Sequence, residues 1–190
     1  MNVKISFLSL YCCGIFFILT SCSLSPAIRT DTIGVSSEPN KLLTIRIERW
    51  DEELFSGFLG LRKDAEFSYI LLDATGVKLL EAEVSGGGGH NLQAKGPLKE
   101  SDLAPFLSEA LSRIYLQEPD RTPCAGSWFY RLCRENHVEI KEKSWKKHAR
   151  TGFFTIWQAS GSTIEGDKET VVYSQPWLGV SIELEPMMNH

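Results

Sequence analysis

The chain has 190 residues, of which 43% are hydrophobic, and it carries 20 basic and 24 acidic side chains for a formal charge of −4. The length suits one folded domain. The charge excludes a general nucleic-acid binder, because such a protein presents a clustered basic face.

The N-terminal segment joins a short basic start to an apolar run. Residues 5–19 follow Lys4 and are uncharged and mostly apolar. A helix that crosses a bilayer needs about 20 apolar residues. A shorter run that ends in small residues is typical of a secretory signal peptide. An uncleaved membrane anchor is the alternative, and the short length disfavours it. We therefore expect residues 1–21 to be a signal peptide.

The signal segment ends in Leu19-Thr20-Ser21-Cys22, which resembles a bacterial lipobox. The resemblance implies that the Cys22 thiol receives a diacylglyceryl group and that cleavage before Cys22 frees an amino group for acylation. Each buried methylene adds about 0.8 kcal/mol to membrane affinity, so several chains make a stable anchor. Ser23 follows the cysteine, and by analogy this favours the outer membrane, with the domain facing the periplasm.

Residues 22–40 are rich in Ser, Thr, Pro and Gly, and we expect them to be a lipidated tether before a folded domain at 41–190. In that domain Cys124 and Cys133 are the remaining cysteines. Two cysteines in an oxidising compartment predict a disulfide. A zinc site completed by His137, or two free thiols, are the alternatives, although the spacing fits no zinc ribbon or finger.

The first part of the domain has strand patterns. Residues 43–48 alternate between apolar and polar side chains, as in a half-buried strand. Residues 54–63 are also strand-like, and Gly57 and Gly60 indicate a bend or bulge. Residues 66–84 predict a hairpin with its turn near Asp73-Ala74-Thr75-Gly76.

One helix follows, and strands then return. Ser101 is the expected N-cap of a helix that reaches Leu116, with Pro105 tolerated in its first turn. A shorter helical piece is expected at 128–134. Strand patterns then cover four segments: 138–141, 151–159, 170–174 and 177–185. The order strands, helix, strands predicts an α+β fold dominated by antiparallel sheet.

No catalytic or metal-binding signature is present in the sequence. Residues 161–168 only approach a phosphate loop, because Asp167 precedes the lysine and the segment lies between strands. The histidines show no ligand spacing, and neither G-x-S-x-G nor H-E-x-x-H occurs. We expect no enzymatic activity, no cofactor and no metal.

The lipobox, the short tether and residues 56–84 together resemble small outer-membrane lipoproteins of the LolA/LolB type. The matching positions are Ser56-Gly57, Ile70-Leu71-Leu72 and Gly76. The resemblance implies a strongly curved antiparallel half-barrel with a main helix and a shorter helical piece over its concave face. It also implies an apolar cavity that binds or transfers an amphipathic ligand, namely an acyl chain, a lipid or a lipoprotein. The alternative is a structural or interaction lipoprotein with a filled core, which recruits a protein partner at a sheet edge.

Alternation along two late strands predicts which side chains line such a cavity. One face of each strand supplies Phe154, Ile156, Leu178, Val180, Ile182 and Leu184. The opposite face carries Phe153, Trp157 and Trp177.

Overall fold

The computed structural model describes residues 28–30, 41–63, 67–85, 88–138, 142–164 and 168–187. The expected signal peptide and Cys22 lie outside the described residues. The strands are β1 (Ile28–Thr30), β2 (Lys41–Arg49), β3 (Glu52–Lys63), β4 (Phe67–Asp73), β5 (Lys78–Ser85), β6 (Gly88–Ala94), β7 (Gln117–Pro119), β8 (Cys124–Gly126), β9 (Arg131–Val138), β10 (Glu142–Thr151), β11 (Phe154–Ile164), β12 (Lys168–Gln175) and β13 (Val180–Pro186). The described helices are α2 (Leu103–Tyr115) and the 3-10 turns η1 (Gly96–Glu100) and η2 (Pro176–Leu178).

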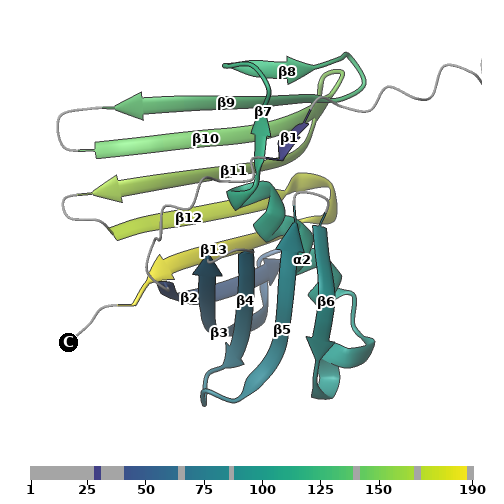
Figure 1. The fold of residues 1–190 in the computed structure, drawn as a ribbon, viewed down its shortest axis with the longest axis vertical. Coiled ribbons are helices and arrows are strands. Elements are labelled where there is room, and N and C mark those ends of the chain that lie inside the picture. The colour runs from purple at the N-terminus through teal and green to yellow at the C-terminus, as the bar shows by residue number, and fades with distance from the viewer. Residues whose placement is uncertain are drawn as a thin grey trace, which may run out of the picture.

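The described strands form an 11-stranded antiparallel sheet in the order β6-β5-β4-β3-β2-β13-β12-β11-β10-β9-β8, and β1 pairs separately with β7. The sheet is curved and open: β9–β13 run across the view in Figure 1, β3–β6 run vertically, and α2 lies in the hollow between them. The predicted α+β fold with a dominant antiparallel sheet is confirmed. Residues 28–30, within the segment expected to be the tether, form β1.

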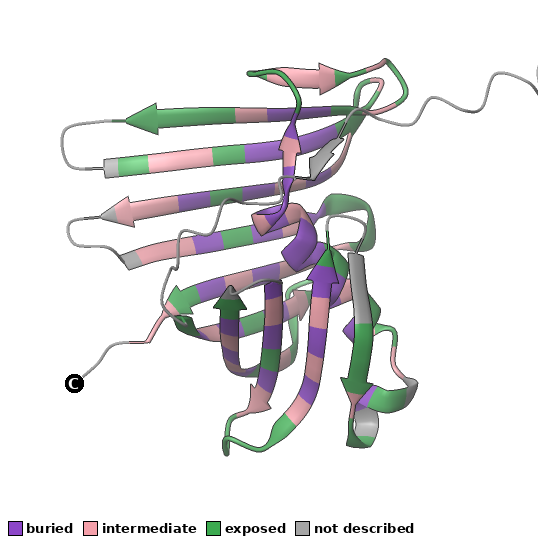
Figure 2. Cartoon of the chain, in the orientation of Figure 1, coloured by how far each residue is buried: buried purple, intermediate pink, exposed green. Residues whose placement is uncertain are grey.

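The core lies between α2 and the concave face of the sheet. Side chains along β2, β4, β5 and β13 alternate between buried and more exposed, as the purple bands of Figure 2 show. Ile45, Ile47, Ile182 and Leu184 are almost completely buried. Each such side chain stabilises the fold by about 1.5–3 kcal/mol relative to an exposed one.

The predicted turn near Asp73 is confirmed. The Asp73 carboxylate accepts hydrogen bonds from the Thr75 amide at 2.8 Å, the Thr75 hydroxyl at 2.6 Å and the Val77 amide at 2.9 Å. Gly76 has a φ of 85°, a left-handed conformation that suits glycine. The Thr75 side chain and neighbouring amides therefore lower the pKa of the Asp73 carboxyl.

The predicted second helix at 128–134 is wrong. Residues 131–134 belong to β9, which pairs with β10 on one side and with β8 on the other. Leu132 and Cys133 are both buried, and pairing with two strands satisfies their backbone groups where a short helix would not. The predicted main helix is present, but it begins at Leu103, and the Ser101 hydroxyl donates to the Leu98 carbonyl instead of capping it.

Candidate functional site

The candidate site is the concave face of the sheet under α2. One face of the helix is apolar and buried, with Leu107, Ala110, Leu111 and Ile114 almost completely hidden from solvent. The helix packs against β5, β6 and β7. Three aromatic side chains form the facing surface, and they are also fully buried: Tyr69, Trp157 and Tyr173. A face of this composition suits an apolar chain, and in this structure α2 occupies it.

Hydrogen bonds from side chains hold α2 on the sheet. The Tyr69 hydroxyl lies 2.7 Å from the Ser108 hydroxyl, and the Ser112 hydroxyl donates to the Ser85 carbonyl at 2.8 Å. The Arg113 guanidinium donates to the Tyr173 hydroxyl at 2.7 Å and lies over the Trp157 ring. Burial raises the pKa of Tyr69 to about 12, so its hydroxyl remains protonated at neutral pH. Each of these bonds contributes about 1 kcal/mol.

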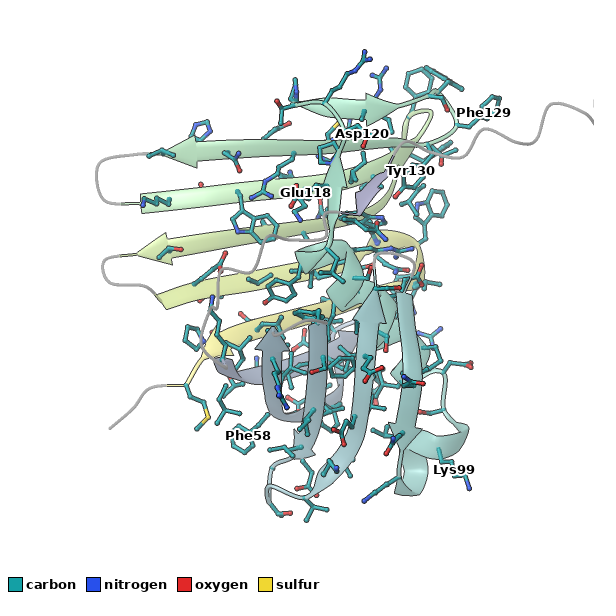
Figure 3. All side chains as sticks on the ribbon, viewed as in Figure 1. Phe58, Lys99, Glu118, Asp120, Phe129 and Tyr130 are labelled. Carbon is teal, nitrogen blue, oxygen red and sulfur yellow. A yellow bond between two sulfur atoms is a disulfide. The ribbon has the colours of Figure 1, made fainter. Side chains whose placement is uncertain are left out.

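A buried charged cluster fixes the C-terminal end of α2. The Lys147 ammonium group, whose side chain is 2% exposed, lies 2.7 Å from the Ile114 carbonyl, 3.1 Å from the Gln117 carbonyl and 2.7 Å from the Glu118 carboxylate. Arg134 pairs with the same carboxylate. Figure 3 places Glu118 on β7, in front of β9 and β10. The cluster therefore connects β7 and the end of α2 to the sheet.

Burial and charge act in opposite directions on the pKa values of this cluster. Burial lowers the pKa of Lys147, and the nearby Glu118 carboxylate only partly offsets that effect. Burial alone would raise the pKa of Glu118, but the hydrogen bond from Arg134 and the charge of Lys147 outweigh it and hold that pKa below its usual value. Glu118 is therefore ionised at neutral pH, and its carboxylate pairs with both the Lys147 ammonium and the Arg134 guanidinium.

The structure divides the predicted cavity residues into two groups. On β13, Ile182 and Leu184 are fully buried, and Val180 is partly buried and packs against the core. Leu178 lies in η2 and is 46% exposed, so it is not a lining residue. Gly179 ends η2 in a left-handed conformation and β13 begins only at Val180, so alternation along the strand does not extend back to Leu178.

On β11 the prediction is wrong for Phe154, which is 60% exposed, and for Trp157, which was expected on the other face and is fully buried. Ile156 is partly buried and packs against the core, as Val180 does. The register with β10 shifts between Ala149 and Arg150 and leaves Ile156 without a paired residue. A bulge of this kind changes which side chains share a face, so alternation counted from Phe154 assigns Trp157 to the wrong side.

Sequence reasoning also missed Lys147. It follows another lysine in a charged segment, which is typical of a solvated surface. Lys147 shares one face of β10 with Trp145 and Ala149, two residues that are less polar. That alternation could have indicated that the face, Lys147 included, is buried. The Trp145 ring covers the cluster, with the Lys147 nitrogen 5.5 Å from its centroid, and its indole NH donates to Glu169 at 2.6 Å.

The cysteine pair lies at the edge of the sheet. Cys124 and Cys133 are directly opposite each other in β8 and β9, and their sulfur atoms are 2.02 Å apart, a disulfide distance. Within the described ranges there is no group of three or more His, Cys, Asp or Glu residues that could hold a metal ion. No helix in the part of the chain that the structure describes is both long and apolar enough to cross a membrane.

Comparison with known proteins returned no relative: no protein-family model, no curated protein and no solved structure matches this chain.

Proposed function

We propose that the chain is a lipid-anchored protein of the bacterial envelope that binds an amphipathic ligand, an acyl chain or a lipid, on the concave face of its sheet in exchange for α2. The observation that supports this proposal is the amphipathic helix α2 lying in the hollow of an open, curved, apolar sheet. When α2 leaves, an acyl chain covers the exposed apolar surface and recovers about 25 cal/mol per Å².

The polar groups beneath α2 favour such an exchange. Ser108, Ser112 and the Tyr69 hydroxyl form hydrogen bonds when α2 is seated, and water replaces these partners when it leaves. If the contact between α2 and the sheet were wholly apolar, water could not offset any of the free energy lost when α2 leaves. The helix is also bounded by η1 and by the short strand β7, and it is not part of the sheet.

Weakening the seat of α2 tests the exchange. The double variant Tyr69→Phe/Arg113→Gln removes two of the side-chain hydrogen bonds that hold the helix. Apparent affinity scales with the fraction of molecules that are open, so binding of a fluorescent fatty acid should tighten by about tenfold. Lys78→Gln, which removes only an exposed ion pair with Glu81, is the control and should leave binding unchanged. If the double variant binds the probe no better than wild type, α2 does not act as a lid.

Lipidation of Cys22 is a separate expectation. The lipobox lies at the end of a short apolar segment, so the mature protein should lack residues 1–21 and carry acyl groups on Cys22. Intact-mass analysis of protein extracted from membranes measures both changes. Cys22→Ser should leave the membrane fraction or remain unprocessed. An unmodified Cys22 in a chain that retains Met1 would refute the anchor.

A structural or interaction lipoprotein is the second candidate. The observation that favours it is that Leu107, Leu111, Ile182 and Leu184 already fill the concave face. A partner strand would then pair with β6 or β8, the two edges of the sheet. In that case the fatty-acid probe shows no saturable binding, and Tyr69→Phe/Arg113→Gln is merely less stable.

A further inference from the structure

All the exposed Phe and Trp side chains in the described part of the chain lie on four turns. The turns are those between β2 and β3, β8 and β9, β10 and β11, and β12 and β13. We call the set the aromatic rim, and it consists of Trp50, Trp128, Phe129, Phe153, Phe154 and Trp177. Because the strands alternate in direction, these turns meet at one end of the sheet, at the right of Figure 1. Figure 3 shows Phe129 there, at the far end of the turn after β8.

Four rings of the rim pack in two edge-to-face pairs. Trp128 contacts Phe153 edge to face with ring centroids 5.2 Å apart, and Phe154 contacts Trp177 in the same way at 5.4 Å. The Trp177 indole donates to the Thr155 carbonyl at 2.8 Å. The Trp50 amide donates to the Gly179 carbonyl at 2.8 Å. The rings therefore keep a fixed arrangement while remaining open to solvent.

The Trp50 ring also lies directly on a glycine. A Cβ added to Gly179 would come within 2.3 Å of the Trp50 ring, and Gly179 has a left-handed φ of 60°. Only glycine satisfies both conditions, so the backbone at this turn is shaped to hold the ring. Three of the four turns, at 127–130, 151–154 and 175–179, carry no charged residue. Trp is typical of the headgroup level of a membrane, and Trp and Phe together are typical of surfaces that bury into the boundary between headgroups and acyl chains.

A basic pocket lies beside the rim. It has a volume of about 290 Å³, and its lining includes Arg131, Arg150, Ser127 and Trp128. Arg131 and Arg150 are directly opposite each other in β9 and β10, and like charges in such a pair repel. Among the described residues, no ion pair or hydrogen bond engages either guanidinium. Glu135 is the only carboxylate in the lining.

His148 gives the pocket a third polar group without a partner among the described residues. The residue is 8% exposed, it lines the pocket, and its Nδ1 atom forms no hydrogen bond with another described group. A buried polar atom of this kind is costly unless a partner occupies the site. Two unpaired guanidinium groups and an unsatisfied imidazole together match a phosphate group.

We propose that the aromatic rim docks on the surface of a phospholipid bilayer and that the pocket between Arg131 and Arg150 receives a lipid phosphate. A flat bilayer contacts the tips of four neighbouring turns at once, with aromatic rings at headgroup depth and arginines on phosphates. Of the four turns, the one that carries Trp50 has acidic residues beside it, Asp51 and Glu52, which repel a phosphate. The phosphate contact is therefore expected at the β8–β11 end of the rim.

The expected anchor agrees with this orientation, although the docking surface does not depend on ligand binding under α2. Cys22 precedes Ile28 of β1 by six residues, which span about 20 Å when extended. β1 pairs with β7, and β7 packs against β8 and β9, whose connecting turn carries Trp128 and Phe129. An anchor of that length holds the rim near the membrane.

Vesicle binding by the mature chain, residues 22–190 with Cys22→Ser, tests the rim without either the lipid or the apolar signal segment. Co-sedimentation with vesicles of phosphatidylglycerol and phosphatidylethanolamine should show binding, and tryptophan emission should shift to shorter wavelength. Adding Phe129→Asp and Phe153→Asp should weaken binding by about tenfold or more. The matched control is Val138→Asp, at the other end of β9, where the side chain is 75% exposed. It should bind like the parent, and denaturation curves establish that each variant is folded.

The pocket is tested by Arg131→Gln/Arg150→Gln in the same background. Affinity for phosphatidylglycerol vesicles should fall about tenfold and lose most of its salt dependence, while Lys143→Gln on β10 has no effect. Absence of vesicle binding by Cys22→Ser protein, or equal binding by the Phe variants, would overturn the proposal. Binding of inorganic phosphate without vesicle binding would identify a soluble-anion site instead. None of these measurements uses the fatty-acid probe or a variant of α2. A negative result would therefore refute membrane docking without refuting ligand binding under α2.

Discussion

Glu118→Gln is expected to lower the free energy of unfolding by about 2–4 kcal/mol, because it leaves the buried Lys147 ammonium without its counter-charge. The same change removes the acceptor that Arg134 uses. Chemical denaturation at neutral pH measures the loss. Lys147→Met should cost less, since Glu118 then keeps Arg134 and no buried cation remains unpaired.

The effect of Glu118 should depend on pH in a defined direction. Arg134 and Lys147 hold the folded pKa of Glu118 below its usual value, although burial opposes them. Its stabilisation is therefore complete above the unfolded pKa, about 4.3, and is lost as pH falls through the lower folded pKa. The difference between wild type and Glu118→Gln should shrink in acid. The control is Glu109→Gln, an exposed partner of Arg113, which should cost less than about 1 kcal/mol. Equal costs for both variants would contradict a buried cluster.

Gly57→Ala is expected to cost about 2–3 kcal/mol, the upper end of the range for overpacking. A Cβ at Gly57 would lie 2.3 Å from the Leu72 carbonyl oxygen and 2.8 Å from the Phe55 ring. The carbonyl belongs to the neighbouring strand, so the clash can be relieved only by moving the backbone of β3 or β4. The substitution therefore acts on the curvature that makes the sheet concave.

Gly60→Ala is the matched control in the same strand. A Cβ at Gly60 would meet only the Ile70 carbonyl, at 3.8 Å, which is ordinary contact. Its free energy of unfolding should change by less than about 0.5 kcal/mol. Urea denaturation of the two variants provides the comparison. A tolerated Gly57→Ala would mean that β3 and β4 can separate without loss of packing.

Local patterns predicted the parts of the fold that local chemistry determines. The Asp73–Gly76 turn follows from residues that hydrogen-bond within the turn itself. The inward side chains of β13 follow from unbroken alternation, and α2 follows from apolar residues at helical spacing. In each case the signal lies within a few neighbouring residues, and no distant contact reverses it.

Other parts depend on partners that are distant in sequence. The bulge opposite Ala149 is a property of the β10–β11 pair, so alternation within β11 could not place Trp157. Residues 128–134 have helical spacing, but pairing with β8 and β10 makes their latter part a strand. Lys147 is buried because Glu118 and two carbonyls surround it, and the sequence around Lys147 contains none of them.

The most direct test of ligand exchange is photolabelling of the mature protein, extracted from membranes, with a diazirine fatty acid, followed by peptide mapping. The account predicts labels on side chains that α2 covers, above all Tyr69, Trp157 and Tyr173, and competition by unlabelled fatty acid. Labels confined to the aromatic rim, or labelling that no competitor reduces, would contradict binding on the concave face.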